Sequence, residues 1–292
     1  MKSFSSMHPI TQAVWFTLTA LCVMFSMNPI IAVVSFTGAF VLYIFRNGAK
    51  GLKTHLWFLA MWLGIVIINP LISHNGATVF LVINKQPITM ESAVYGAVSG
   101  TVILSVLYLF RTFSQIMTSD RLMYLCGKLS PKLSLVMSMA LRYTALFTQQ
   151  TRKVQQYQKA TGLYKEDNII DTIRGGVRIF SIMLTWALEH GITTADSMTA
   201  RGYGTGKRTQ YAVYRFSSAD TVMLILSVLF GAVTFTAQIS GKMNMEFYPK
   251  LSLTEITPHG ITGYISYGIL VILPIVSEIT ENIKWKYYLS NI

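Results

Sequence analysis

The distribution of charged residues constrains the fold more than any other feature of this sequence. Between Ser3 and Phe45 there is no Asp, Glu, Lys or Arg. A helix needs about 20 consecutive, mostly apolar residues to cross the hydrocarbon core of a bilayer. Long uncharged stretches therefore predict membrane spans, and further stretches of this kind cover residues 54–84, 92–110, 221–241 and 256–277.

These stretches predict an all-α, polytopic integral membrane protein with about six transmembrane helices. The first stretch is long enough for two spans and is interrupted midway by Asn28-Pro29, a pair that is typical of turns. We expect two helices there, at about 11–27 and 30–45. The other spans are expected at about 56–73, 92–110, 221–241 and 256–277.

The spans divide the chain into three parts. An N-terminal membrane part (1–110) holds about four spans and a C-terminal membrane part (219–292) holds about two. Between them lies a basic region, 111–218, without an uninterrupted apolar stretch long enough to cross a membrane. We expect this region to form amphipathic helices outside the bilayer.

The basic residues indicate which side of the membrane each segment faces. The chain has 24 Lys and Arg residues against 12 Asp and Glu, and its formal net charge is +12. If both termini are cytoplasmic, only Lys85, Lys242 and Lys250 fall outside cytoplasmic segments. Cytoplasmic loops carry an excess of Lys and Arg, so we predict a multi-pass protein of the cell membrane with both termini in the cytoplasm. No cleavable signal peptide is expected, because the apolar stretch after Lys2 is far longer than such a peptide contains.

Composition excludes several classes of protein. Hydrophobic residues make up 52% of the chain and charged residues only 12%, against about 25% charged residues in soluble domains. This excludes an ordinary soluble enzyme, a disordered regulator and a nucleic-acid-binding module. The expected partner is the lipid bilayer, and no nucleic acid is expected.

Residues 111–218 show helical periodicity. Apolar residues from Lys132 onward recur at helical spacing, Ser130-Pro131 is a start signal, and Gly162 is a stop signal. A second helix is expected from about Asp167 to Glu189. A third, short helix is expected to begin at Thr194 or Asp196 and to end in the glycines at 202–206. Such helices lie along a membrane face or dock on a partner, and a solvated basic face attracted to anionic lipid is the alternative.

Residues that carry chemistry are scattered. The five histidines and the two cysteines, Cys22 and Cys126, have neither metal-ligand nor disulfide spacing, so we expect no catalytic residues, no metal and no cofactor. The segment 202–208 (GYGTGKR) lacks both the first glycine and the Ser/Thr of a Walker A loop, so no ATPase activity of its own is expected. Asp220 and Glu278 lie at the ends of predicted spans and are expected to be interfacial anchors.

One run of residues resembles a known family signature. Residues 194–204 (TADSMTARGYG) are similar to the signature of the transmembrane coupling subunit, or T component, of energy-coupling factor (ECF) transporters, the CbiQ/EcfT family. The resemblance extends in order along nearly the whole chain. Its other segments are His8-Pro9, Asn69-Pro70-Leu71, Pro87–Glu91, Thr118-Ser119-Asp120 and Leu141-Arg142-Tyr143.

The resemblance implies a specific role. A T component is a scaffold without enzymatic activity that holds a substrate-binding membrane S component. Its cytoplasmic helices end in two Ala-Arg-Gly motifs, each seated in a groove of one of two ATP-binding-cassette ATPase subunits. ATP hydrolysis by these subunits then drives uptake of a vitamin or a transition-metal ion such as cobalt through the S component.

The resemblance also names the site. Ala200, Arg201 and Gly202 match the second motif, in which arginine can pair with carboxylates of a partner. At the position of the first motif the chain reads Ala160, Thr161 and Gly162, so threonine replaces arginine. Either this contact is weaker, or a nearby basic residue supplies the charge; the candidates are Arg152, Lys153 and Lys159.

Two other functions remain as alternatives. The first is the permease of a conventional ABC importer, which would itself line the substrate path. The second is a membrane-embedded transferase with 111–218 as its catalytic face. The second would need clustered acids or histidines near the membrane, and the acidic residues of this region form no recognisable motif. These residues are Asp120, Glu166, Asp167, Asp171, Glu189 and Asp196.

Overall fold

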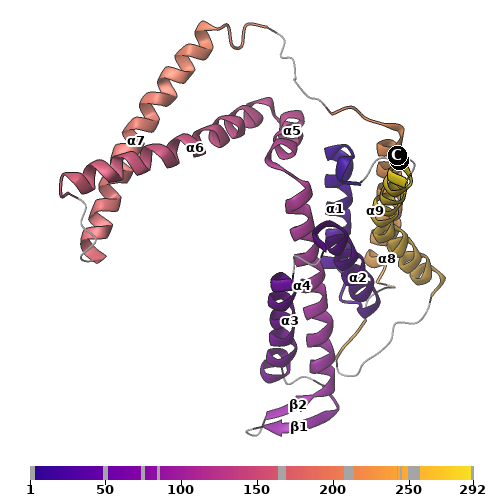
Figure 1. The fold of residues 1–292 in the computed structure, drawn as a ribbon. Coiled ribbons are helices and arrows are strands. Elements are labelled where there is room, and N and C mark those ends of the chain that lie inside the picture. The colour runs from indigo at the N-terminus through magenta and orange to yellow at the C-terminus, as the bar shows by residue number, and fades with distance from the viewer. Residues whose placement is uncertain are drawn as a thin grey trace. The chain divides into compact units, whose positions relative to one another are not determined.

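A computed structural model describes the chain over residues 4–48, 52–73, 76–83, 86–163, 169–206, 214–241, 243, 245–248 and 257–290. It divides into two compact units. The first, here the membrane unit, comprises Met1–Leu122 and Tyr214–Ile292, and the second, here the α6–α7 unit, comprises Met123–Val213 (Figure 1).

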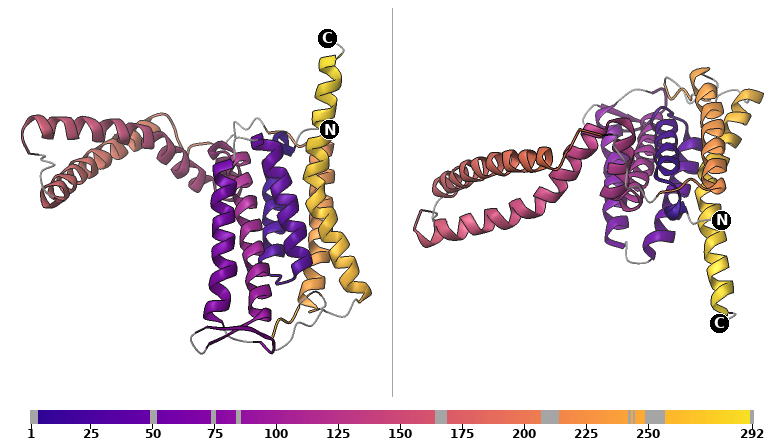
Figure 2. Two further views of the ribbon diagram at one scale, coloured as in Figure 1. Left: turned by 60° about the horizontal axis from the view of Figure 1, so that its bottom comes forward. Right: turned by 90° about the horizontal axis from the view of Figure 1, so that it is seen from above.

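The membrane unit is a bundle of apolar helices that lie side by side (Figure 2). Five helices within the described residues are long and apolar enough to cross a membrane, and α1, with 16 residues, is a shorter apolar helix. Each predicted span corresponds to one of these helices, so the predicted fold class is confirmed. The helices are α1 (Pro9–Met24), α2 (Pro29–Asn47), α3 (Leu52–Ile72), α4 (Met90–Ile116), α8 (Ser218–Ile239) and α9 (Pro258–Ser290).

The starts of α1 and α2 have the same chemical cause. Each helix begins with proline, whose missing N–H is not needed at the first helical position. The preceding side chain then caps the helix: His8 Nδ1 accepts from the amide of Ile10 at 3.2 Å, and Asn28 Oδ1 accepts from that of Ile30 at 2.9 Å. The predicted boundary at Asn28-Pro29 is therefore confirmed.

Close packing joins the membrane helices. α2 packs against α4 and α9, α1 against α8, α8 against α9, and α3 against α4. The largest buried side chains include Trp15 and Tyr267, and their polar atoms are paired: Trp15 Nε1 donates to the carbonyl of Leu270 at 2.8 Å, and the Tyr267 hydroxyl meets that of Ser35. At both positions, therefore, the buried polar atom has a hydrogen-bond partner, as is usual for buried polar groups.

Two elements were not predicted from the sequence. Between α3 and α4 lies an antiparallel pair of strands, β1 (Val79–Ile83) and β2 (Gln86–Thr89). After α4, a short helix α5 (Ser119–Leu129) precedes α6. The end of the uncharged stretch 54–84 therefore forms a strand rather than a longer helix.

The helices of the α6–α7 unit correct one prediction. α6 (Pro131–Ala160) is confirmed, but the two helices expected after it are a single one, α7 (Ile169–Ala200). The expected start residues, Thr194 and Asp196, both lie inside α7, and the Thr194 hydroxyl meets that of Tyr143 on α6 at 2.6 Å instead of capping a helix. The expected helix start at Asp167 lies outside the described residues.

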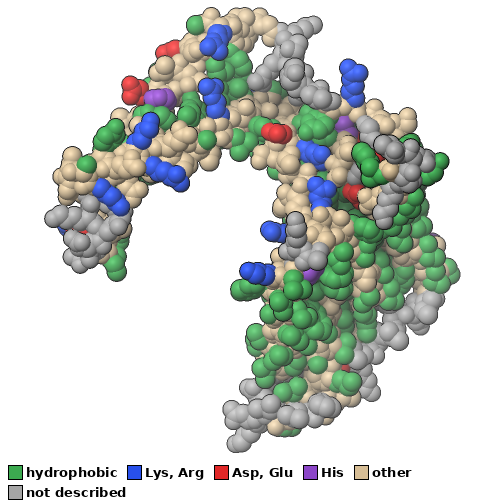
Figure 3. Space-filling model, in the orientation of Figure 1, with side chains coloured by type: hydrophobic (Ala, Val, Ile, Leu, Met, Phe, Trp, Pro, Cys, Tyr) green, Lys and Arg blue, Asp and Glu red, His purple; other side chains and the backbone are tan. Residues whose placement is uncertain are grey.

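The surfaces of the two units differ in chemistry. Hydrophobic side chains cover much of the visible face of the membrane helices, whereas Lys and Arg side chains are spread along α6 and α7 (Figure 3). On α3, the face turned away from α4 carries exposed apolar residues, including Leu56, Trp57 and Ile67. An apolar surface of this kind is what lipid contacts require.

Candidate functional site

The predicted site residues lie at the ends of two helices that cross. The hydroxyls of Tyr143 on α6 and Thr194 on α7 are 2.6 Å apart, and the rings of Phe147 and Trp186 meet edge to face at 5.4 Å. Residue numbers rise along α6 as they fall along α7 through this crossing, so the helices are antiparallel. Their C-terminal ends therefore point in opposite directions (Figure 1).

The end of α7 has a defined hydrogen-bond pattern. Arg201 is the residue directly after the last helical residue, and Gly202 has a positive φ of 78°. The amide of Gly202 donates to the Thr199 carbonyl at 2.9 Å, and that of Tyr203 to the Met198 carbonyl at 3.0 Å. These two bonds define a Schellman motif, in which glycine adopts the left-handed conformation without a Cβ clash.

The end of α6 repeats this pattern. Thr161 follows the last helical residue, and Gly162 has a positive φ of 72°. The amide of Gly162 donates to the Lys159 carbonyl at 3.1 Å, and that of Leu163 to the Gln158 carbonyl at 3.0 Å. Ala160, Thr161 and Gly162 thus occupy the same three positions of a Schellman motif as Ala200, Arg201 and Gly202.

The two motifs differ in what their central residue offers. Arg201 is exposed, and its guanidinium forms no hydrogen bond or ion pair with any described residue. The Thr161 hydroxyl instead donates back to its own helix, to the carbonyls of Tyr157 at 3.0 Å and Gln158 at 3.2 Å. The α7 end therefore presents five free donors and a charge, whereas the α6 end presents neither from its central residue.

The side of α7 carries an exposed apolar stripe. Six large apolar residues recur at intervals of three or four along α7, which places them on one face. We call this set the α7 stripe. Its members are Ile173, Val177, Phe180, Leu184, Leu188 and Ile192.

A second cluster lies where the chain leaves the membrane unit. Arg121, at the start of α5, donates through Nη1 to Gln12 Oε1 at 2.8 Å and through Nη2 to the carbonyl of Ser5 at 2.7 Å. Gln12 is fully buried and also donates to the carbonyl of Phe4. The N-terminal segment, residues 4–12, therefore holds the beginning of α5.

The same N-terminal segment also contacts the start of α8, where the chain re-enters the membrane unit. The Asp220 carboxylate, at the start of α8, accepts from the amide of His8 at 2.9 Å and from that of Ser217 at 2.8 Å. The His8 ring stacks on Phe216 with centroids 3.8 Å apart. Asp220 is fully buried, and its carboxylate joins the start of α8 to the start of α1. Sequence reasoning marked His8-Pro9 but not its partners, because the contact pairs residues more than 200 positions apart.

The chain is similar to proteins of known class. The sequence model of the CbiQ family, described as cobalt transport protein, matches residues 2–212. Several relatives carry the name energy-coupling factor transporter transmembrane protein EcfT. That of Streptococcus equi is 28% identical over 106 residues, 36% of this chain and 39% of the relative. That of Listeria innocua is 33% identical over 103 residues, which is 34% of this chain and 39% of the relative.

A further relative aligns over a longer stretch. EcfT 1 of Listeria monocytogenes is 24% identical over 199 residues, which is 63% of this chain and 72% of the relative. With the Streptococcus equi relative the alignment spans only about two fifths of the relative's length. The family match over residues 2–212 is the broader finding, and by it this chain belongs to the CbiQ family of transmembrane transporter subunits, which are not enzymes.

Proposed function

We propose that this chain is the T component of an ECF-type importer. In this role it couples ATP hydrolysis by two ATP-binding-cassette subunits to the uptake of a vitamin or a transition-metal ion. The substrate is bound by a separate membrane S component. The names of the relatives support this assignment, as does an apolar bundle with a separate, basic helical unit.

The observation that carries the proposal is the equivalence of the two helix ends. Both tripeptides end a long amphipathic helix, and both occupy the same positions of a Schellman motif. A scaffold that binds two related ATPases needs two equivalent surfaces, and two helix ends of identical backbone geometry meet that need. Alanine and glycine on either side of the central residue leave room for a partner's groove to close around it.

Arg201 is the proposed anchor of the stronger contact. A guanidinium offers planar, bidentate hydrogen bonds to carboxylates, and that of Arg201 has no described partner within the chain. At the α6 end, Ala160, Thr161 and Gly162 form the weaker contact, because the Thr161 hydroxyl is bonded to its own helix.

The α7 stripe supports the same role. A row of exposed large apolar side chains is unfavourable in water and marks a surface that a partner or lipid covers. We assign region 111–218 to the cytoplasm, with both termini on the same side, because its Lys and Arg residues follow the positive-inside rule. The S component and the membrane surface are the proposed cover for the stripe.

The test is to substitute Arg201 and measure co-purification of the ATPases together with uptake. Arg201→Ala leaves a partner carboxylate unpaired in a desolvated groove, which costs about 2–5 kcal/mol. Association at that end should therefore weaken about 30-fold or more. Arg201→Lys should restore it only in part, because an ammonium lacks the planar fork.

Arg174→Ala is the matched control. Arg174 is also exposed on α7 and has no described partner, so its loss should leave co-purification and uptake unchanged. Thr161→Arg should strengthen the α6 contact if the facing groove carries an acid. Wild-type co-purification and uptake by Arg201→Ala would show that Arg201 is only a solvated charge and would overturn the proposal.

A further inference from the structure

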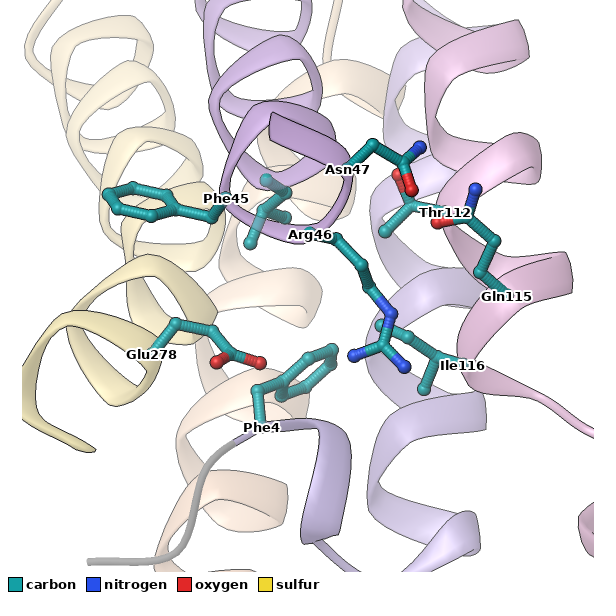
Figure 4. A pocket seen from close by; sticks show the side chains of 9 residues that line it. Phe4, Phe45, Arg46, Asn47, Thr112, Gln115, Ile116 and Glu278 are labelled. Atoms are coloured by element: carbon teal, nitrogen blue, oxygen red, sulfur yellow. The ribbon is translucent and has the colours of Figure 1, made fainter. Parts of the chain in front are cut away.

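A polar cavity lies at one end of the membrane bundle. It has a volume of about 560 Å³ and opens among the N-terminal segment, the ends of α2 and α4, and α9. We call it the end pocket. Its lining residues are Phe4, Leu42, Phe45, Arg46, Asn47, Thr112, Gln115, Ile116 and Glu278 (Figure 4). Cavities of this size are typical of sites for small ligands.

The charges of the end pocket place it at the edge of the hydrocarbon. Arg46 is the first charged residue after the uncharged stretch that contains α2, and Glu278 is the first after the uncharged stretch of α9. Charged side chains at such positions lie at the level of the lipid headgroups. Leu42 and Phe45, one turn or less before Arg46, lie on the hydrocarbon side.

Two groups in the end pocket lack partners. The Arg46 guanidinium extends into the pocket from α2 (Figure 4) and makes no hydrogen bond or ion pair with any described residue. Gln115 Oε1 is buried and has no hydrogen-bond donor among the described residues. Because this oxygen is closed off from the open space of the pocket, the Arg46 guanidinium is the unpaired group that a ligand can reach.

Glu278 faces the same space from the opposite side. Its carboxylate points toward the pocket beside Phe4 (Figure 4), and its Oε1 accepts from the amide of Ser5 at 3.2 Å. The pocket therefore has a cation on one wall and an anion on another. A simple anion would suit only Arg46, and a simple cation only Glu278.

We propose that the end pocket binds the headgroup of phosphatidylethanolamine. The phosphate pairs with Arg46, since guanidinium and phosphate form strong, charge-assisted hydrogen bonds. The primary ammonium donates to the Glu278 carboxylate. The glycerol and the first acyl carbons contact Phe45, which is 47% exposed. This inference is independent of the coupling function.

Related headgroups separate the parts of this assignment. Phosphatidylcholine has the same phosphate and charge, but its quaternary ammonium has no N–H donor. Phosphatidylglycerol has the phosphate but no ammonium for Glu278. Free phosphoethanolamine has both groups but no acyl chains, so it distinguishes a membrane lipid from a soluble ligand of the same chemistry.

The experiment is native mass spectrometry of the purified full chain with phosphatidylethanolamine, phosphatidylcholine and phosphatidylglycerol. The three lipids have the same acyl chains and are added at equal concentration. We expect phosphatidylethanolamine to be retained about tenfold more than the other two, because one charge-assisted hydrogen bond is worth about a factor of ten. Millimolar phosphoethanolamine should not displace it. Displacement at concentrations equal to those of the lipid would identify a soluble ligand and overturn the lipid assignment.

Three variants test the residues. Arg46→Gln should reduce phosphatidylethanolamine retention about tenfold, and Glu278→Gln should abolish its preference over phosphatidylglycerol. Arg111→Gln is the matched control, because Arg111 also ends an uncharged stretch but lines a separate hollow with Lys53 and Trp57. Equal retention of the three lipids by the wild-type chain overturns the proposal, even if a variant fails to fold.

Discussion

Gly38 marks the closest approach of α2 to α9. A Cβ at this position would lie 2.0 Å from Val271 Cγ1, well inside van der Waals contact. Valine has few alternative rotamers in a helix, so the helices themselves must separate. We expect Gly38→Ala to destabilise the bundle by about 1–3 kcal/mol, measured as a lower midpoint of thermal unfolding in detergent.

A control and a rescue accompany this prediction. At Gly64 on α3 an added Cβ would meet nothing within 4 Å, so Gly64→Ala should leave the midpoint unchanged or raise it. Combining Gly38→Ala with Val271→Ala should recover part of the loss, since the clashing methyl is removed. Equal midpoints for Gly38→Ala and the wild type would mean that α2 and α9 pack more loosely than described.

At the scale of elements, Asp220 joins the starts of two helices. Its two carboxylate oxygens accept from the amides of His8 and Ser217 and so tie the start of α8 to the start of α1. Asp220→Asn keeps the shape of the side chain but replaces one carboxylate oxygen with an NH2 group, which then faces a backbone N–H instead of accepting from it. This should lower the free energy of unfolding by about 1–3 kcal/mol. The amide hydrogens of His8 and Ser217 should then exchange at least about fivefold faster with solvent.

Asp196→Asn provides the comparison for this measurement. Asp196 is an exposed acid in the last turns of α7, and its neutralisation should leave exchange at residues 8 and 217 unchanged. If Asp220→Asn also leaves that exchange unchanged, the carboxylate does not hold the N-terminal segment.

Elements differed in how far the sequence could predict them. The membrane helices were predictable because charged side chains are unfavourable in lipid, so each span appears in the sequence as a long stretch without charged residues. The continuity of α7 was not predictable, because Thr194 and Asp196 are residue types that favour caps, and the sequence does not show that the Thr194 hydroxyl meets that of Tyr143 on α6 instead. The β1–β2 pair was likewise hidden within an uncharged stretch.

The candidate site divides in the same way. The positions of Ala160 and Ala200 with their following residues could be found from the sequence, because glycine after a helix is a local signal. The return of the Thr161 hydroxyl to its own helix could not be foreseen, since a threonine at this position can equally point outward.

At the scale of the whole molecule, the prediction concerns sidedness. In a Cys126→Ser background, where Cys22 is buried, a cysteine at the exposed Ser119, the first residue of α5, should resist an impermeant thiol reagent in intact cells. A cysteine at Ser240, after α8, should react. Permeabilised cells, in which both should react, provide the control. The reverse pattern would place the α6–α7 unit outside the cell and remove the basis for coupling to cytoplasmic ATPases.

The matching ends of α6 and α7, alike in backbone and different in charge, have a kinetic consequence. Affinity differences between related contacts reside mostly in dissociation rates. In the proposed coupling role, an ATPase held at Arg201 would therefore stay bound longer than one held at Thr161, and a half-assembled complex would survive mainly with its α7 end occupied. Which of the two ATPases leaves first would then depend on the identity of residue 161.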